Sequence, residues 1–365
     1  MNIRILVSIL MAIFLFACKK NATEPVNTIP PASVNTFYFP PVTGTDWQTS
    51  TPASLGWNET ELNNLYSYLD SKNTKAFIIL KNGKIVVERY FGTFTKDSSW
   101  YWASAGKTMT AYLVGIAQQE GLLNINNRSN QYLGAGFTSA PLAKENLITI
   151  RNQLTMTSGL DDGVPDSDCT LPACLVYKAD AGTRWAYHNA AYTLLDKVIE
   201  TASGTSFNNY FQQKIRDRIG MNGFWLKSPN SNNVLYSNAR SMARFGLLML
   251  NKGKWDQTTI LGDSVYLNNQ INTSQNINLS YGYLTWLNGK ASAMVPTSQI
   301  VFPGSLIPNA PAEMYAALGK NDQKIYVVPS QKLVVIRMGE SAGTVMFAVS
   351  GFDNELWGRL NTIIK

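Results

Sequence analysis

The pattern of apolar and polar residues in the body of the chain predicts an alternation of helices and strands. A first helix begins near Asn58, a favourable N-cap, with Glu61 three residues later as in a capping box. Its apolar residues recur at the spacing of one helical face: Leu62, Leu65, Tyr66 and Leu69. Strands follow at 75–80 and 84–90, and Asn82-Gly83 between them strongly favours a hairpin turn.

The stretch from about 105 to 121 is apolar on most sides, which predicts a central, buried helix. Residues 145 to about 270 have mostly the pattern of helices and loops. Further predicted elements are helices at 191–201 and 241–250, strands at 324–328, 332–338 and 344–349, and a closing helix after Asp353. We therefore expect an α/β (α+β) fold in which the two chain ends build one antiparallel sheet, flanked by helices.

The domain that carries this sheet is expected to span residues 55–365. Its sheet part comprises about 55–115 and 285–365, and a mostly helical insertion occupies about 116–284. We find no internal repeat in the sequence.

The N-terminus has the pattern of an export signal. Residues 1–17 carry one early charge and then an apolar run too short to span a bilayer comfortably. The run ends in Leu15-Phe16-Ala17 before Cys18, which resembles the lipobox of bacterial lipoproteins, where the cysteine is lipidated and becomes the new N-terminus. The alternative is a short anchor with an incidental cysteine.

Residues 18–54 follow as a tether rich in Pro, Thr, Asn and Ser. The aromatic residues Phe37, Tyr38 and Phe39 predict that its later part packs on the body. The expected location is extracytoplasmic, with the lipid holding the protein to a bacterial membrane, at the outer membrane or the periplasmic face. No later stretch is long and apolar enough for a membrane-spanning helix.

Composition excludes several classes of function. The chain of 365 residues has a formal net charge of +7 with no basic run longer than two residues, which does not indicate nucleic-acid binding. His188 is the single histidine, so a two- or three-histidine zinc site is impossible, and no cofactor is implied. In an oxidising compartment Cys169 and Cys174 are expected to form a local disulfide; the alternative is two buried free thiols.

Ser104 and Lys107 form an SxxK motif, and no other serine in the chain has a lysine three residues later. On a helix the two side chains share a face, and strands before Ser104 predict that it lies at the start of the buried helix. The positive helix end favours a serine oxyanion and, together with burial, lowers the pKa of Lys107. A neutral lysine can then activate the hydroxyl without a histidine; the alternative is a solvated helix start where a serine and a lysine meet by chance.

Tyr187-His188-Asn189 provides a second candidate element. In an extended segment Tyr187 and Asn189 point to one side and His188 to the other, which brings a phenol and an amide to the site. A phenol beside Lys107 could become a phenolate and pass protons between Ser104 and the leaving group. The same spacing recurs at Tyr236 and Tyr266, which fit packing or helical positions better.

Together these motifs resemble the penicillin-recognising serine hydrolases: class C β-lactamases, D-Ala-D-Ala carboxypeptidases, related esterases and 6-aminohexanoate-dimer hydrolases. The runs that carry the resemblance occur in family order: WASAGK (102–107), LTMTSGL (154–160), YHNAAYTLL (187–195), MARFG (242–246) and IYVVPS (325–330). They span nearly all of the chain after about residue 55. The resemblance implies a β-lactamase-like fold.

The resemblance also implies roles for individual residues. Ser104 would be the nucleophile, Lys107 its activating partner, Tyr187 the proton shuttle, and Asn189 a contact for the substrate or for Lys107. The family's third motif, often Lys-Thr-Gly or His-x-Gly, corresponds here to Ala-Leu-Gly319-Lys320, which is more similar to the 6-aminohexanoate-dimer hydrolase branch. The backbone N–H of Lys320 would pair with that of Ser104 as an oxyanion hole.

These observations favour a serine hydrolase that cleaves a small ester, linear amide or peptide-like substrate through a Ser104 acyl-enzyme. The first alternative is a β-lactamase or D-Ala-D-Ala carboxypeptidase, which the missing leading Lys or His of the third motif disfavours. The second is a non-catalytic binding module of the cell envelope, which the retention of Ser104, Lys107 and Tyr187 disfavours.

The predicted anchor can be tested at Cys18. In a bacterial host fed an alkyne-labelled fatty acid, the native chain should take up the label and fractionate with membranes. Cys18→Ser removes the thiol that would be acylated, so this variant should lose both properties. Equal labelling of Cys18→Ser and the native chain would contradict lipidation at this position.

Overall fold

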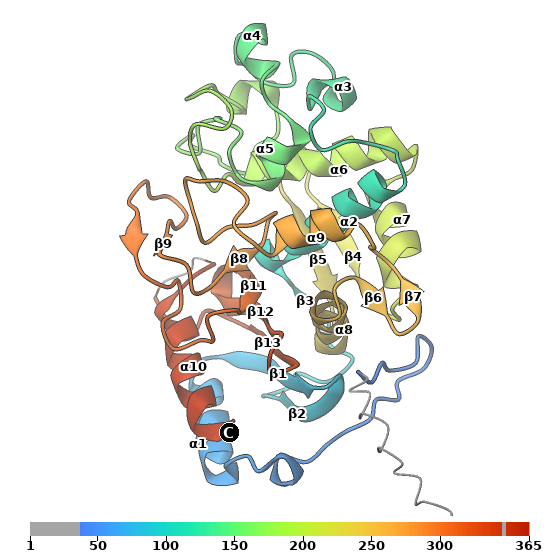
Figure 1. Ribbon diagram of the computed structural model, residues 1–365, viewed down its shortest axis with the longest axis vertical. Helices are drawn as coiled ribbons and strands as arrows, with labels where there is room; N and C mark the ends of the chain where they lie inside the picture. The colour runs from blue at the N-terminus through green and yellow to red at the C-terminus, as the bar shows by residue number, and fades with distance from the viewer. Residues whose placement is uncertain (1–36, 345–347, 365) are drawn as a thin grey trace, which may run out of the picture. The chain divides into compact units, whose positions relative to one another are not determined.

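A six-stranded antiparallel sheet lies at the centre of the fold, and its strands come from both ends of the chain (Figure 1). The computed structural model describes residues 37–344 and 348–364. Along the sheet the strands run in the order β2 (Lys84–Tyr90), β1 (Thr74–Lys81), β13 (Leu333–Gly339), β12 (Gln323–Val328), β11 (Tyr315–Gly319) and β8 (Trp286–Leu287). The expected sheet built from both chain ends is therefore confirmed.

Local turns set the register of the two hairpins that meet in this sheet. Asn82 and Gly83 both have a positive φ, as a tight turn between twisted strands requires, and Lys81 pairs with Lys84. β1 then pairs with β13, which places Phe77 opposite Arg337. Since β1 and β13 lie about 260 residues apart in sequence, this pairing closes the chain on itself.

Helices cover both faces of the sheet. α1 (Glu59–Ser71) and α10 (Gly351–Ile363) pack against each other, as Figure 1 shows. α8 (Ala239–Leu250) packs against β1, β12 and β13 on the sheet. Its approach is close at Gly246, where an added Cβ would lie 2.5 Å from Cγ1 of Val334. Glycine at this position therefore fixes the distance between α8 and the sheet.

The buried helix predicted near 105–121 is α2 (Gly106–Gln119), in which twelve consecutive residues from Gly106 are buried. The other helices in the described part are α3 (Asn130–Leu133), α4 (Leu142–Glu145), α5 (Ile150–Leu154), α6 (Asn189–Ser203), α7 (Phe207–Phe211) and α9 (Ser264–Gln270). Single turns of 3₁₀ helix occur at Ala53–Leu55, η2 (Ala103–Ala105), Pro172–Cys174 and η5 (Lys320–Asp322), and a π-helical turn at Gln212–Arg216.

A second sheet has three strands, in the order β3 (Trp100–Tyr101), β5 (Asn233–Ser237) and β4 (Phe224–Lys227). The insertion expected to be mostly helical supplies β5 and β4, which were not predicted individually, and the segment before Ser104 supplies β3. The strand expected at 344–349 is wrong for its described residues 344, 348 and 349, which lie in an irregular loop before α10. The remaining short strands pair as β6 (Lys254–Trp255) with β7 (Thr258–Thr259) and β9 (Ser292–Ala293) with β10 (Phe302–Pro303).

The segment before α1 packs on the body, as its aromatic residues predicted. Phe37 and Phe39 contact the core, and the Tyr38 N–H donates to the carbonyl of Asn82. The predicted signal segment, Cys18 and the first part of the tether lie outside the described residues. Within residues 37–344 and 348–364, no helix has both the length and the apolar composition to cross a membrane.

Candidate active site

Ser104 lies in the tight turn η2, directly before α2. The turn is held by Trp102, whose indole N–H donates to Oγ of Ser237 at 2.7 Å and whose backbone N–H donates to the carbonyl of Leu235. Ala103 has φ 46°, a left-handed conformation that is unusual for alanine. This strained turn presents Ser104 as a partly exposed side chain at the beginning of a buried helix.

Lys107 is buried beside Ser104 with only 1% of its surface exposed. Its Nζ donates to Oγ of Ser104 at 2.8 Å and to Oδ1 of Asn189 at 2.8 Å. The ammonium nitrogen also lies 4.0 Å from the ring centroid of Tyr192 and 4.9 Å from that of Tyr187. The SxxK spacing thus brings the two groups together, and α6 supplies the amide that orients the lysine.

The electrostatics of this pocket favour a neutral amine. Burial lowers the pKa of Lys107 to about 7, and the carboxylate of Asp168 opposes this fall. The exposed ammonium of Lys320 contributes a smaller lowering of the same pKa. At neutral pH a large fraction of Lys107 therefore carries a lone pair that can accept the proton of the Ser104 hydroxyl.

Tyr187 approaches the same lysine from the segment before α6. Its ring stacks on Trp286 with a centroid distance of 5.7 Å and an interplanar angle of 23°. Its hydroxyl is buried and makes no hydrogen bond to another residue in the described part of the chain. Burial raises the pKa of Tyr187 above its ordinary value, and Ser104 lowers that pKa by a smaller amount. Tyr187 therefore carries a neutral phenol rather than a phenolate.

His188 lies apart from these groups, although it separates Tyr187 from Asn189 in sequence. It is 1% exposed, and neither ring nitrogen has a hydrogen-bond partner among the described residues. Burial lowers the pKa of His188 to about 4, against the opposing effect of nearby carboxylates such as Asp162. A neutral imidazole without hydrogen bonds acts here as a packing residue.

The third element reaches the site through Gly319, the last residue of β11. A Cβ at this position would lie 3.1 Å from the backbone nitrogen of Ser104 and 2.9 Å from that of Ala105. Only glycine therefore allows the strand to approach the turn that carries Ser104. Lys320 follows directly, so its backbone enters the same region.

A buried guanidinium supports the turn after Lys320. Asn321 and Asp322 both have left-handed backbones, with φ 56° and 58°. Arg337, fully buried in β13, donates from Nη1 to their carbonyl oxygens at 2.8 and 3.1 Å. These bonds compensate a conformation that costs energy in residues other than glycine.

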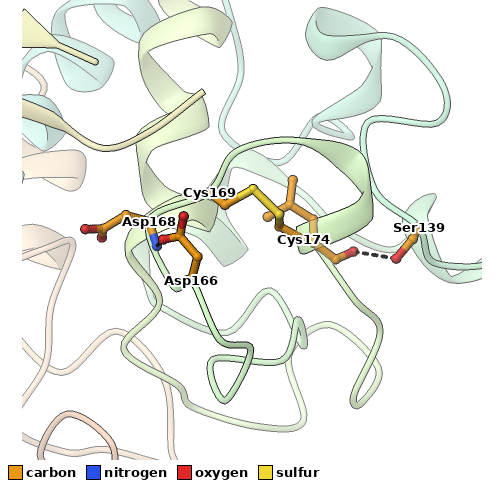
Figure 2. The surroundings of a disulfide bond; sticks show 6 residues. Ser139, Asp166, Asp168, Cys169 and Cys174 are labelled. Atoms are coloured by element: carbon orange, nitrogen blue, oxygen red, sulfur yellow. Dashed lines mark hydrogen bonds between the residues drawn. A yellow bond between two sulfur atoms is a disulfide. The ribbon is translucent and has the colours of Figure 1, made fainter. Parts of the chain in front are cut away.

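The disulfide between Cys169 and Cys174 is formed, as the sequence predicted. Figure 2 shows it closing a small loop, with Asp168 extending to the side away from Cys174. Ser167, two residues before the disulfide, accepts a hydrogen bond from the N–H of Ala190 in the first turn of α6. The bridge thus braces the loop that carries Asp168 next to the helix that carries Asn189.

Three contributors to this site were not assigned a role from the sequence: Asp168, Tyr192 and Arg337. A signal existed for two of them. Tyr192 follows Asn189 by three residues and so shares its helical face, while Arg337 interrupts an otherwise apolar strand, which indicates a buried polar partner. Asp168 lies in an irregular loop, where spacing carries no such information.

The chain is similar in sequence to known proteins. The sequence profile of the Beta-lactamase family matches residues 73–355. An uncharacterized protein of Alkalihalophilus pseudofirmus is 23% identical over 312 residues, covering 76% of this chain and 86% of that protein. A candidate penicillin-binding protein of Bacillus subtilis is 25% identical over 159 residues, covering 40% of this chain and 39% of that protein.

Solved structures share the fold at low identity. A candidate 6-aminohexanoate-dimer hydrolase of Bacillus anthracis superposes with a TM-score of 0.65 at 19% identity, covering 87% of this chain and 86% of that one. A candidate β-lactamase of Bacteroides dorei gives 0.65 at 18% identity, covering 84% and 99%. A penicillin-binding protein of Bacillus halodurans gives 0.58 at 16% identity, covering 81% and 99%.

The low pKa of Lys107 can be measured directly. With lysines labelled at Cε and Nζ, NMR titration should show one ammonium that titrates near pH 7, because burial disfavours its charge. This resonance should vanish in Lys107→Met and persist in Lys84→Met, a control at the opposite end of the sheet. A Lys107 signal that titrates near 10 would contradict the expected burial effect.

His188 should make the fold sensitive to acid. Because its pKa falls from 6.5 to about 4 on folding, the unfolded chain takes up a proton that the native state resists. The free energy of unfolding should therefore drop by roughly 3 kcal/mol as pH falls from about 6.5 to 4. His188→Phe removes the titration and leaves no described hydrogen-bond partner unpaired, so its denaturant-measured stability should lose this part of the pH dependence; an unchanged acid slope would be contrary evidence.

Proposed function

The chain belongs to the Beta-lactamase family, a family of serine hydrolases, and we propose that it cleaves a carboxylic ester or a linear amide through an acyl-enzyme on Ser104. The observation that carries this proposal is the buried Lys107, hydrogen-bonded to Ser104 at 2.8 Å with a pKa of about 7. A lysine in this state can act as a general base in place of histidine.

In the proposed acylation, neutral Lys107 accepts the hydroxyl proton as Oγ of Ser104 attacks the substrate carbonyl carbon. The carbonyl π electrons move to oxygen, and the resulting oxyanion accepts hydrogen bonds from the backbone N–H groups of Ser104 and Lys320. Collapse expels the alcohol or amine, which takes its proton through the Tyr187 hydroxyl, while Lys107 returns a proton to that hydroxyl. Water then repeats the sequence and releases the acid from Ser104.

The pKa values favour Lys107 over Tyr187 as the first proton acceptor. Burial holds Tyr187 in its neutral form, whereas the same burial makes the neutral form of Lys107 accessible near pH 7. A Tyr187 phenolate, which the sequence alone allowed, is therefore disfavoured. A neutral Tyr187 is better suited to relay a proton. The Lys107 pKa also supports a catalyst over a binding module, since burying a lysine that has no ion-pair partner among the described residues costs stability.

The third motif supports an ester or linear amide over a lactam. Ala317 and Leu318 are 0% and 1% exposed and carry no cation where the family often has lysine or histidine. The backbone donor at Lys320 does not depend on this change. A β-lactamase or D-Ala-D-Ala carboxypeptidase remains the second candidate, because the exposed ammonium of Lys320 lies close enough to influence Lys107 and suits a substrate carboxylate.

We also propose that the enzyme works outside the cytoplasm, tethered through a lipid on Cys18. The disulfide Cys169–Cys174 supports this location, because such bonds persist in oxidising compartments. The tether between Cys18 and the body would hold the site away from the membrane surface.

The proposed function is tested by intact-mass spectrometry after exposure to a fluorophosphonate and, separately, to a penicillin. We expect one fluorophosphonate adduct on the native protein, none on Ser104→Ala, and an unchanged adduct on Ser99→Ala, whose serine is exposed. Hydrolysis of a short-chain p-nitrophenyl ester should fall at least 10³-fold in Ser104→Ala. For the native enzyme, kcat/KM with this ester should rise as pH increases through about 7, because Lys107 loses its proton there.

Full ester hydrolysis by Ser104→Ala would overturn the assignment of the nucleophile. A penicillin adduct on Ser104 would instead select the second candidate, and its lifetime would separate a peptidase from a lactamase. Failure of both probes to label the native protein would favour a non-catalytic binding module.

A further inference from the structure

A cavity lies on the opposite side of α2 from Ser104 and Lys107. It has a volume of about 380 Å³ and is lined by α2, the end of α8, β6 and α9. Figure 1 shows α9 lying across α2, with β6 and β7 nearby. Tyr112, which lines this cavity, follows Lys107 by five residues, or about 140° around the helix. The cavity is therefore separate from the site of the proposed hydrolysis.

The floor of this cavity is apolar. Tyr112 and Met249 are each 1% exposed, Leu267 is 7% exposed, and Ile271 is partly buried. Gly262 and the polar residues Ser264 and Asn268 also line the cavity. The Tyr112 ring is held by an edge contact with Phe245 at 5.2 Å. Water against such a surface gains few hydrogen bonds, so an apolar group that displaces it is favoured.

Two lysines line the same cavity from exposed positions. Lys252 follows the C-terminal end of α8, and Lys254 begins β6. Neither ammonium forms an ion pair or hydrogen bond within residues 37–344 and 348–364. Asp263, the N-cap of α9, accepts hydrogen bonds from the backbone N–H of Tyr266 and from Gln118.

The backbone at Lys252 strengthens this observation. Its φ of 51° is left-handed, at the position after a helix where glycine is the favoured residue. Gly253, the next residue, is also left-handed, with φ 78°. A lysine held in this conformation keeps a cationic side chain on the lining of the cavity at a conformational cost.

We propose that this cavity binds a single-chain amphiphile with an anionic carboxylate head. The alkyl chain would lie on the floor formed by Tyr112, Met249, Leu267 and Ile271, and the carboxylate would lie between Lys252 and Lys254. Tyr112 lines the same cavity, and its hydroxyl makes no hydrogen bond to another described residue, so it would supply a further donor to the ligand. The volume lies in the range of small-ligand sites, about 300–1,000 Å³.

Charge and polarity together select this ligand class. An inorganic anion would leave the apolar floor without a partner, and an alkyl cation would be repelled by the two lysines. A neutral alkane would gain no electrostatic attraction from the two exposed ammoniums. The proposal goes beyond the proposed hydrolysis, since binding here requires none of Ser104, Lys107 or Tyr187.

The test uses the full chain carrying Ser104→Ala in detergent-free buffer, so that no acyl-enzyme can form. Isothermal titration calorimetry with decanoate, kept below its micelle concentration, should show one bound molecule per chain. Acetate and decyltrimethylammonium, which lack the tail or invert the charge, should each bind at least tenfold more weakly.

Two variants locate the site. Lys252→Gln/Lys254→Gln should weaken decanoate binding at least tenfold, while the charge-matched Lys84→Gln/Lys197→Gln should leave it unchanged. Ile271→Trp should weaken binding by filling the cavity without changing charge. Each variant is first shown by thermal unfolding to retain the native fold.

Several results would overturn the proposal. Absence of decanoate binding would do so, as would binding that neither the lysine variant nor Ile271→Trp weakens. If the control pair of lysine substitutions weakened decanoate binding as much as Lys252→Gln/Lys254→Gln, the overall positive charge would explain the effect. If acetate bound as tightly as decanoate, the cavity would be only an anion site. If decyltrimethylammonium bound as tightly, it would be only an apolar surface. None of these outcomes bears on fluorophosphonate labelling of Ser104, so the two proposals fail independently.

Discussion

The pairing of β1 with β13 is the constraint on which the rest of the structure depends. It joins the N-terminal and C-terminal parts of the chain and leaves the whole insertion to be folded between them. The site is assembled across this junction, because Ser104 follows the first hairpin whereas Gly319 belongs to the last strands. The contact between Gly319 and the Ser104 turn is thus a consequence of sheet register, and a one-residue slip would turn the strand's side chains to the other face.

Burial of Lys107 is the second determinant. A charged ammonium at this depth is unfavourable, and the described structure supplies an amide oxygen, a hydroxyl and two aromatic faces instead of a direct carboxylate partner. Asp168 attracts the charge of Lys107 electrostatically and raises its pKa, whereas the positive charge of Lys320 lowers that pKa. The site therefore lowers the cost of burial by releasing the proton, and that same release creates the base that the chemistry needs.

Features set by local chemistry could be predicted from the sequence. Residue type and spacing are enough to predict the Asn82-Gly83 turn and the buried helix after Ser104. They also predict that Tyr187 and Asn189 point to the same side of their segment. The strand β4 could not be predicted, because Phe224 and Leu226 are half exposed or more. In β5 buried and partly buried positions alternate, but the buried face includes the polar residues Asn233 and Ser237, so it leaves no apolar alternation in the sequence. Asp168 reaches the site through a disulfide-closed loop, which leaves no periodic signal. Arg337 is visible as a charge in an apolar strand, but its long-range hydrogen bonds, which determine its role, are not.

The division between backbone and side-chain chemistry explains how this site can retain a mechanism while its specificity changes. The oxyanion donors proposed here are main-chain groups, and their position depends on Gly319 and on the turn that Arg337 holds. The side chains before Gly319 can then be replaced by Ala317 and Leu318 without moving those donors. A substrate carboxylate, by contrast, needs a side-chain cation at a fixed place. Under the proposed function, the absence of a leading lysine or histidine would therefore change which acyl groups are recognised far more than how they are cleaved.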